Sequence, residues 1–292
     1  MASEKHITLK SGHKLWTKTV GAGKGTPLLL LHGGPGAGHD YLEPLEGLGD
    51  ERPVVFYDQL GCGRSDKPTS RLLWTIERFA DEIDEVRHAL GLDTVHMLGQ
   101  SWGGWLGVEY LTRQPAGLKS FVLASTSASI PQFRSECARL IAELPPAMQT
   151  ALAEHGARGE LDHPEYAAAA MEFYKRHLCR LPEWPDCVMR SIANLDGNAV
   201  YETINGPNEF TVIGNLRYWD RIDRLPEIKV PILITCGRYD ELGPNCAATL
   251  QAGLPNARTV IFENSAHTPH VEEVNAYLKT VRAFLTEVDT PA

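Results

Sequence analysis

The sequence predicts an α/β fold with a mostly parallel, doubly wound sheet and an inserted helical cap. Short, continuously apolar runs such as 27–32 and 53–58 are typical of strands buried on both faces of a parallel sheet. Strand-like runs also alternate with helical patterns, which indicates right-handed crossover connections. This alternation stops between about 130 and 222 and then resumes. A chain of 292 residues is long enough for one large domain with such an insertion.

The elements before the break can be justified one by one. Six runs with alternating or continuous apolar residues are expected to be strands: 6–10, 13–20, 27–32, 53–58, 93–99 and 118–126. The segment 74–92 has apolar residues at helical spacing and ends at Gly91, a residue favoured just after a helix. A second helix is expected to follow the strand 93–99 and to stop by Pro115.

The second half begins with a long stretch that lacks any strong strand pattern. It is rich in alanine at 165–177 and is interrupted by prolines, which favours an inserted helical subdomain. The earlier rhythm then returns with four expected elements: a strand at 230–237, a helix at 244–253, a strand at 257–264 and a final helix at about 270–286. We therefore predict an α/β core formed by 1–128 and 223–292, with a helical cap at 129–222.

Composition argues against several classes of function. The net charge is −9, from 28 basic and 37 acidic residues, so neither nucleic acid nor an anionic membrane is an expected partner. The first ten residues are polar, which predicts no signal peptide, and the longest apolar runs are only strand-length. The six cysteines show neither paired nor metal-binding spacing. These features predict a cytoplasmic protein with reduced thiols and without a metal site.

A serine stands between glycines where a predicted strand meets a predicted helix. Residues 99–103 fit the pattern G-x-S-x-G, with Ser101 at its centre. A serine at such a sharp turn takes a strained backbone conformation, and flanking glycines remove side chains that would collide there. The helix that follows directs its free N–H groups toward the same place. We therefore predict that Ser101 is a nucleophile.

A serine hydroxyl needs a general base, and in this type of fold the chain order is serine, then an acid, then histidine. The loop after the strand 230–237 offers Asp240 and Glu241, and the loop after 257–264 offers His267 and His270. We predict His267 as the base and Asp240 as the residue that orients it, because both directly follow late strands. His270 as the base and Glu241 as the acid stay open as alternatives.

Acyl transfer also requires an oxyanion hole. One donor is expected to be the backbone N–H of Trp102, directly after the nucleophile. The glycine-rich loop 32–36 (HGGPG) follows an early strand and lets the backbone approach a substrate carbonyl. We expect Gly34 in this loop to supply the second donor.

Several of these motifs together resemble one enzyme family. They are HGGPG at 32–36, YDQLGCGRS at 57–65, GQSWGG at 99–104, GRYDE at 237–241 and NEFTVIGNLRYWD at 208–220. In these motifs the chain resembles the proline iminopeptidases, which are α/β-hydrolase serine exopeptidases. The resemblance implies a cofactor-free serine hydrolase that releases an N-terminal residue, preferably proline, from peptides, amides or arylamides. L-amino-acid amidases share most of these motifs, so an amidase or esterase acting on small non-peptide substrates is the alternative.

The resemblance further implies that Glu209 and Glu241 bind the free amino group of a small or short-peptide substrate. This agrees with elementary chemistry, because charge-assisted hydrogen bonds are stronger than neutral ones and an N-terminal proline offers two N–H donors. A pocket for the proline ring also needs apolar walls. Five aromatic residues are candidates for these walls, although core packing explains most of them equally well: Trp102, Trp105, Phe133, Tyr201 and Trp219.

Overall fold

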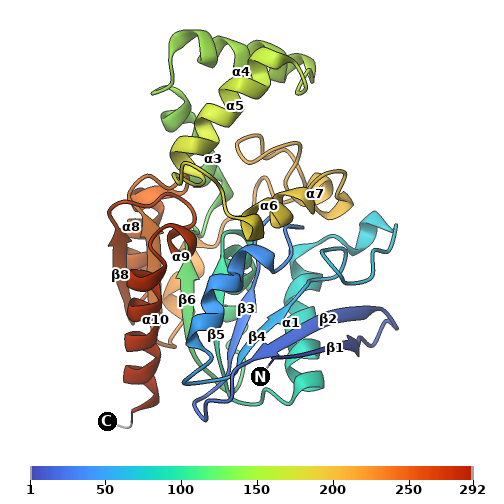
Figure 1. Cartoon of the computed structure of the whole chain (residues 1–292), viewed down its shortest axis with the longest axis vertical. Helices are drawn as coiled ribbons and strands as arrows, with labels where there is room; N and C mark the ends of the chain where they lie inside the picture. The colour runs from blue at the N-terminus through green and yellow to red at the C-terminus, as the bar shows by residue number, and fades with distance from the viewer. Residues whose placement is uncertain (1, 291–292) are drawn as a thin grey trace.

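The computed structural model describes residues 2–290, which form an α/β structure around an eight-stranded sheet with helices on both sides (Figure 1). The strands are β1 (Ala2–Thr8), β2 (Lys14–Val20), β3 (Leu28–Leu31), β4 (Val54–Tyr57), β5 (Val95–Gln100), β6 (Leu118–Ala124), β7 (Ile232–Gly237) and β8 (Ala257–Phe262). Their spatial order is β1-β2-β4-β3-β5-β6-β7-β8, and only the β1–β2 and β2–β4 pairs are antiparallel. The predicted fold class is confirmed.

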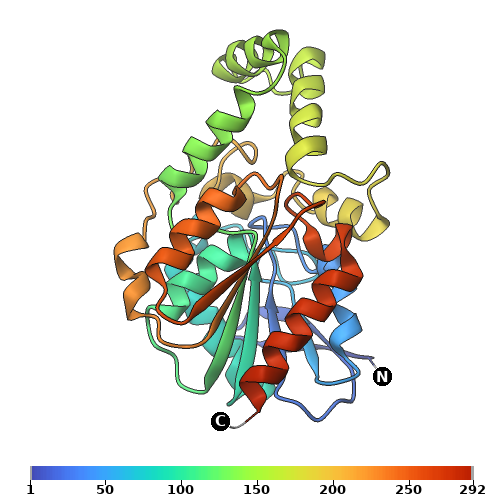
Figure 2. The ribbon, with the colours of Figure 1, turned by 90° about the vertical axis from the view of Figure 1, so that its left-hand side faces the viewer.

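Helices cover both faces of this sheet (Figures 1 and 2). The core helices are η1 (Asp40–Leu48), η2 (Arg71–Leu73), α1 (Ile76–Leu90), α2 (Trp102–Leu111), η3 (Ile222–Glu227), α8 (Gly243–Gly253), α9 (Pro269–Glu272) and α10 (Val274–Asp289). The strand β3 shows why its run of leucines is apolar throughout. Leu29 and Leu31 belong to one core cluster together with residues of α1, α2 and α8, whereas Leu28 and Leu30 belong to a second cluster together with residues of η1 and α10.

The helix α1 follows its sequence signals closely. The side chain of Thr75 accepts a hydrogen bond from the backbone N–H of Arg78 and so caps the first turn. Gly91 ends the helix at φ 68°, a left-handed conformation that glycine adopts without strain. Three of the apolar residues at helical spacing, Phe79, Ile83 and Val86, are fully buried in the core.

The segment between β6 and β7 contains five helices and, among the residues described, no strand of the sheet. They are α3 (Ile130–Ile141), α4 (Pro146–Arg158), α5 (Pro164–His177), α6 (Asp186–Ala193) and α7 (Ala199–Ile204). The helices α4 and α5 form a hairpin that projects from the rest of the molecule, whereas α6 and α7 lie lower, over the ends of the strands (Figure 1). We call the segment 129–222 the cap.

The end of the chain differs from the prediction of one final helix. The carboxylate of Glu273 accepts hydrogen bonds from Ser265 and Asn264, and its backbone leaves the helical region, so the short α9 and the long α10 are separate helices. Asp289, the last residue of α10, links this helix to the sheet. The carboxylate of Asp289 lies within hydrogen-bonding distance of four side chains: Thr26, Arg52, His96 and Lys119.

None of the helices in the described part of the chain combines the length and the apolar character needed to cross a membrane.

Candidate active site

The turn between β5 and α2 holds Ser101 in a strained conformation. Its φ of 57° and ψ of −122° are rarely adopted by residues with a side chain. A Cβ atom at Gly99 would collide with the carbonyl oxygen of Gly103, and one at Gly103 would collide with the carbonyl oxygen of Leu31. The two flanking glycines are therefore required by the close approach of the backbone at this turn. Ser101 lines a cavity of about 70 Å³.

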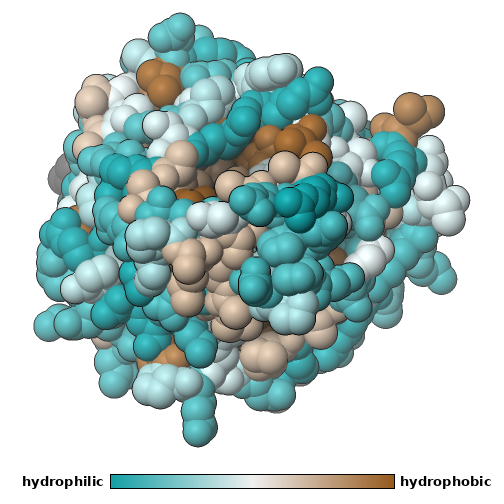
Figure 3. Space-filling view, turned by 90° about the horizontal axis from the view of Figure 1, so that it is seen from above, coloured by the Kyte–Doolittle hydropathy of each residue, from teal (hydrophilic) through white to brown (hydrophobic). Residues whose placement is uncertain are grey.

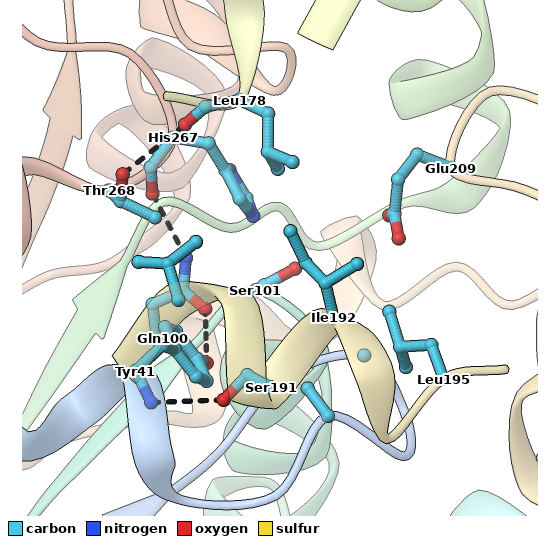
Figure 4. Close-up of a pocket in the computed structure, with 13 residues that line it drawn as sticks. Tyr41, Gln100, Ser101, Leu178, Ser191, Ile192, Leu195, Glu209, His267 and Thr268 are labelled. Atoms are coloured by element: carbon cyan, nitrogen blue, oxygen red, sulfur yellow. Dashed lines mark hydrogen bonds between the residues drawn. The ribbon is translucent and has the colours of Figure 1, made fainter. Parts of the chain in front are cut away.

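His267 and Asp240 meet at the ends of neighbouring strands. They lie in the loops after β8 and β7, and Nδ1 of His267 donates to Oδ1 of Asp240 at 2.8 Å. The same oxygen accepts from the backbone N–H of Leu242 at 3.0 Å. His267 lines the cavity together with Ser101, and its ring points toward Ser101 (Figure 4). The three residues predicted as a triad are thus brought to one place.

The two alternatives left open by the sequence lie differently. His270 belongs to α9 and packs edge-on against the rings of Tyr41 and Tyr277. Glu241 faces the other ring nitrogen of His267, with its Oε1 at 3.9 Å from Nε2. Nδ1 of His267 therefore donates its hydrogen bond to Asp240 and not to Glu241, and His270 is not part of this arrangement.

The two glutamates expected to bind an amino group both lie near His267. Glu209 lines the cavity across from Ser101, and its Oε1 accepts from the hydroxyl of Tyr201 at 2.8 Å (Figure 4). Glu241 is only 1% exposed, and neither of its carboxylate oxygens has a hydrogen-bond partner. Buried carboxylates are normally paired, so an unpartnered one marks a place where a positively charged ligand would be stabilised.

These carboxylates change the acidity of the site. Burial alone would lower the pKa of His267, but Asp240, Glu241 and Glu209 raise it to about 9. Burial also raises the pKa of Glu209, against the opposing effects of Tyr201 and His267. Glu241 is affected in the same direction and more strongly, because burial and the neighbouring carboxylates raise its pKa well above the usual range.

The predicted oxyanion loop and the start of α2 lie beside Ser101. Gly34 lines the cavity, and its φ of 110° together with the tight space around it favours glycine. The N–H of the preceding Gly33 is already occupied, because it donates to the hydroxyl of Tyr41 at 2.7 Å. Trp102 directly follows Ser101 as the first residue of α2.

The expected aromatic walls are replaced by aliphatic ones. None of the five aromatic candidates is among the described residues that line this cavity. The indole N–H of Trp102 donates to Gln59 at 2.8 Å, and that of Trp105 donates to Ser127 at 3.1 Å, so both rings belong to the core. The apolar residues that do line the cavity are Ala37, Leu178, Val188, Ile192 and Leu195.

Comparison with known proteins places this site in a family. The family model described as "alpha/beta hydrolase fold" matches residues 26–274. A proline iminopeptidase of Heyndrickxia coagulans is 38% identical over 99% of this chain and 100% of its own length. The chain belongs to the proline iminopeptidase family. The solved proline iminopeptidase of Mycobacterium smegmatis has a TM-score of 0.92 and 37% identity, and covers 98% of this chain and 99% of its own. The crystal structure of VinJ is also similar, with a TM-score of 0.95, 38% identity and the same coverage. The resemblance expected from the motifs is confirmed.

In this family member, two glutamines connect the parts of the site, and the sequence analysis did not find them. The side chain of Gln100 accepts from the hydroxyl of Tyr41 at 2.5 Å and donates to the carbonyl of His267 at 3.0 Å. Gln59 joins Trp102 to the carbonyl of His32 in the glycine-rich loop. Gln100 is the variable residue before the serine in G-x-S-x-G, so its position was the only available signal.

The C-terminal end of α5 in the cap is bonded to both loops that carry the predicted acid and base. Nδ1 of His177 donates to the carbonyl of Tyr239 at 2.8 Å, and the carbonyl of His177 accepts from the N–H of Glu241 at 3.3 Å. The carbonyl of Leu178 accepts from the N–H of His267 at 3.1 Å. These contacts place cap residues directly behind the acid and base loops.

Side chains that could ligate a metal gather in two other places within the described residues. His39, Asp40 and Glu43 form one group, but Nδ1 of His39 is bonded to Asp58, and Arg190 pairs with both acids. The other group, at the tip of the cap, is formed by His155, His163 and Glu165. The centroids of its two stacked imidazole rings are 3.7 Å apart, and Nδ1 of His155 is hydrogen-bonded to Glu160. Neither group lines the cavity.

Proposed function

We propose that this chain is a serine aminopeptidase that releases an N-terminal residue, preferably proline, from peptides, amides or arylamides with a free amino group. The observation that carries this proposal is the buried, unpartnered carboxylate of Glu241, which lies close to His267 and within electrostatic range of Glu209. Such a carboxylate stabilises an ammonium group, which distinguishes an N-terminus from an internal peptide bond. Membership of the proline iminopeptidase family supports the same conclusion.

The proposed reaction uses Ser101 as the nucleophile. His267 accepts the serine proton while Asp240 holds its ring, and the serine oxygen forms a bond to the substrate carbonyl carbon. The backbone N–H groups of Gly34 and Trp102 stabilise the negative charge on the carbonyl oxygen. The protonated His267 then gives its proton to the leaving nitrogen. This leaves an acyl-enzyme on Ser101, which a water molecule activated by His267 hydrolyses.

The charges of the site indicate that substrate binding favours the neutral form of His267, in which the ring can act as a base. In the free protein three carboxylates raise the pKa of His267 to about 9, which favours the protonated imidazole at neutral pH. A substrate ammonium bound between Glu209 and Glu241 brings one positive charge close to His267 and offsets one of these negative charges. The pKa of His267 therefore falls when the correct substrate binds, and the neutral ring becomes available as a base.

The core and the cap have different roles in the proposed reaction. We propose that the core formed by 1–128 and 223–292 carries the catalytic residues and that the cap, 129–222, carries Glu209 and closes over the substrate. No cofactor, metal, nucleic acid or membrane takes part. A cytoplasmic location is supported by the cysteines, because all six are free.

A comparison of free and blocked substrates tests the function. Prolyl p-nitroanilide should be cleaved, and N-acetyl-prolyl p-nitroanilide should not, because acetylation removes the ammonium group. Glu209→Gln should reduce the first reaction far more than the hydrolysis of p-nitrophenyl acetate, which has no amino group. Equal cleavage of the free and blocked anilides would instead favour a simple amidase or esterase. Ser101→Ala should abolish labelling by a fluorophosphonate.

A further inference from the structure

The cavity at Ser101 extends beyond the catalytic residues on the side of His267. Leu178 and Thr268 lie next to His267, and Val188, Ser191 and Ile192 contribute one face of α6. In Figure 4 Glu209 and Thr268 lie on opposite sides of Ser101. Seen from above, apolar residues lie in recesses between hydrophilic ones on this end of the molecule (Figure 3). The cavity therefore has one end near Glu209 and another end near Thr268.

The direction in which a substrate lies follows from the proposed function, on which this inference rests. The ammonium group is held by Glu209 and Glu241, and the carbonyl carbon lies at Ser101. The nitrogen of the leaving group must reach Nε2 of His267, because this atom supplies its proton. The residue that follows the scissile bond then occupies the end of the cavity near Thr268.

The polar side chains at this end are already engaged with the protein. The hydroxyl of Tyr41 is bonded to Gln100 at 2.5 Å, and the amide of Gln100 is bonded to the carbonyl of His267 at 3.0 Å. Ser191 accepts from the backbone N–H of Tyr41 at 2.9 Å. The hydroxyl of Thr268 lies 3.3 Å from the carbonyl of Leu178. Among the described residues that line the cavity, only Glu209 and His267 are ionisable apart from Tyr41.

We propose that this end of the cavity is an apolar subsite for the leaving group, formed mainly by Leu178 and Val188. A charged side chain placed there would lose its water without gaining a partner, which is unfavourable. An apolar side chain would instead gain from leaving water. The preferred substrates are therefore peptides whose second residue is apolar, and arylamides are cleaved because an aromatic amine occupies the same place.

A series of prolyl dipeptide amides, Pro-X-NH₂, tests the subsite, with prolinamide as the reference that lacks a second residue. With X as leucine, kcat/KM should exceed that for glycine by about tenfold or more, since burial of a leucine side chain is worth at least that factor. Aspartate and lysine should fall below glycine. Equal rates for leucine and glycine, with prolinamide cleaved, would overturn the subsite and leave the proposed function intact. No cleavage of prolinamide or of any dipeptide amide would overturn the proposed function and the subsite with it.

Substitutions on α6 test whether this helix is responsible for the preference for an apolar second residue. Val188→Asp should bring the leucine-to-glycine ratio of kcat/KM close to one and raise the value for lysine relative to leucine. Met189→Asp is the matched control, because Met189 lies on the same helix, is 49% exposed and does not line the cavity. This control should keep the ratio of the native protein. Val188→Thr hardly changes the shape of the side chain, so this variant should fold even if the aspartate variant does not. It should lower the leucine-to-glycine ratio of kcat/KM severalfold. An unchanged ratio in both Val188→Asp and Val188→Thr would refute the assignment.

Discussion

Replacing Glu241 by glutamine tests the proposed role of this carboxylate in substrate binding separately from its destabilising effect on the folded protein. Burial and the carboxylates of Glu209 and Asp240 raise the pKa of Glu241 well above 4.5, although His267 opposes them. Above pH 4.5 the unfolded chain ionises at this residue while the folded chain still holds the proton. The native protein therefore loses stability as the pH rises from 4.5 to the folded pKa.

The size of this loss follows from the shift itself. Each unit by which the folded pKa exceeds the unfolded one corresponds to about 1.4 kcal/mol. Glu241→Gln has no proton to lose at this position. Its free energy of unfolding should match that of the native protein near pH 4 and exceed it at pH 8.

Activity should change in the opposite direction. A hydrogen bond to a charged group is worth about 1.5–3 kcal/mol, so kcat/KM for prolyl p-nitroanilide should fall about 10- to 100-fold. Hydrolysis of p-nitrophenyl acetate should change little. Urea unfolding at both pH values and the two kinetic assays measure these effects, with the exposed Glu183→Gln as the control. Lower stability at pH 8, or an equal loss on both substrates, would refute the reasoning and make Glu241 a structural residue.

Three further predictions follow from other parts of the molecule. With p-nitrophenyl acetate, kcat/KM should rise with pH and level off near pH 9, because His267 must be neutral to accept a proton and its pKa is about 9; a plateau from pH 6.5 upward would contradict this. His177→Ala should lower kcat about fivefold by removing the hydrogen bond to the loop at Tyr239, whereas His177→Asn, which keeps a donor, should recover part of the loss at unchanged KM. Asp289→Ala should reduce the free energy of unfolding by about 2–3 kcal/mol, because the buried Arg52 loses its partner. In the native protein this contribution should be lost as the pH falls below 3.8, since the surrounding donors hold the pKa of Asp289 below that value.

Local sequence patterns predicted the core of this fold well because the core obeys local rules. The leucines of β3 are buried on both faces, so a continuous apolar run was sufficient to identify the strand. Gly91 and the glycines around Ser101 occupy conformations or contacts that exclude other residues, which makes such positions readable from the sequence. The boundary between α9 and α10 was missed because it depends on the hydrogen bonds of Glu273 to another loop.

The site was predictable only in part, for a related reason. Ser101, Asp240 and His267 follow strands, so the topology of the sheet brings them together. Much of the cavity wall comes from Leu178 and from α6 in the cap, whose side chains are placed by tertiary packing alone. The isolation of Glu241 also has no local signal, because a missing hydrogen-bond partner is a property of the whole neighbourhood.

The hydrogen bonds made by His177 and Leu178 have a consequence for the engineering of this family. A cap that shares bonds with the loops of Asp240 and His267 is not an interchangeable module. A chimaera that takes its cap from a relative must carry the end of α5 together with both of those loops, or the graft will misalign the residues it was meant to serve. Designs that alter substrate choice should therefore keep this junction and change α6, which lines the cavity without making these bonds.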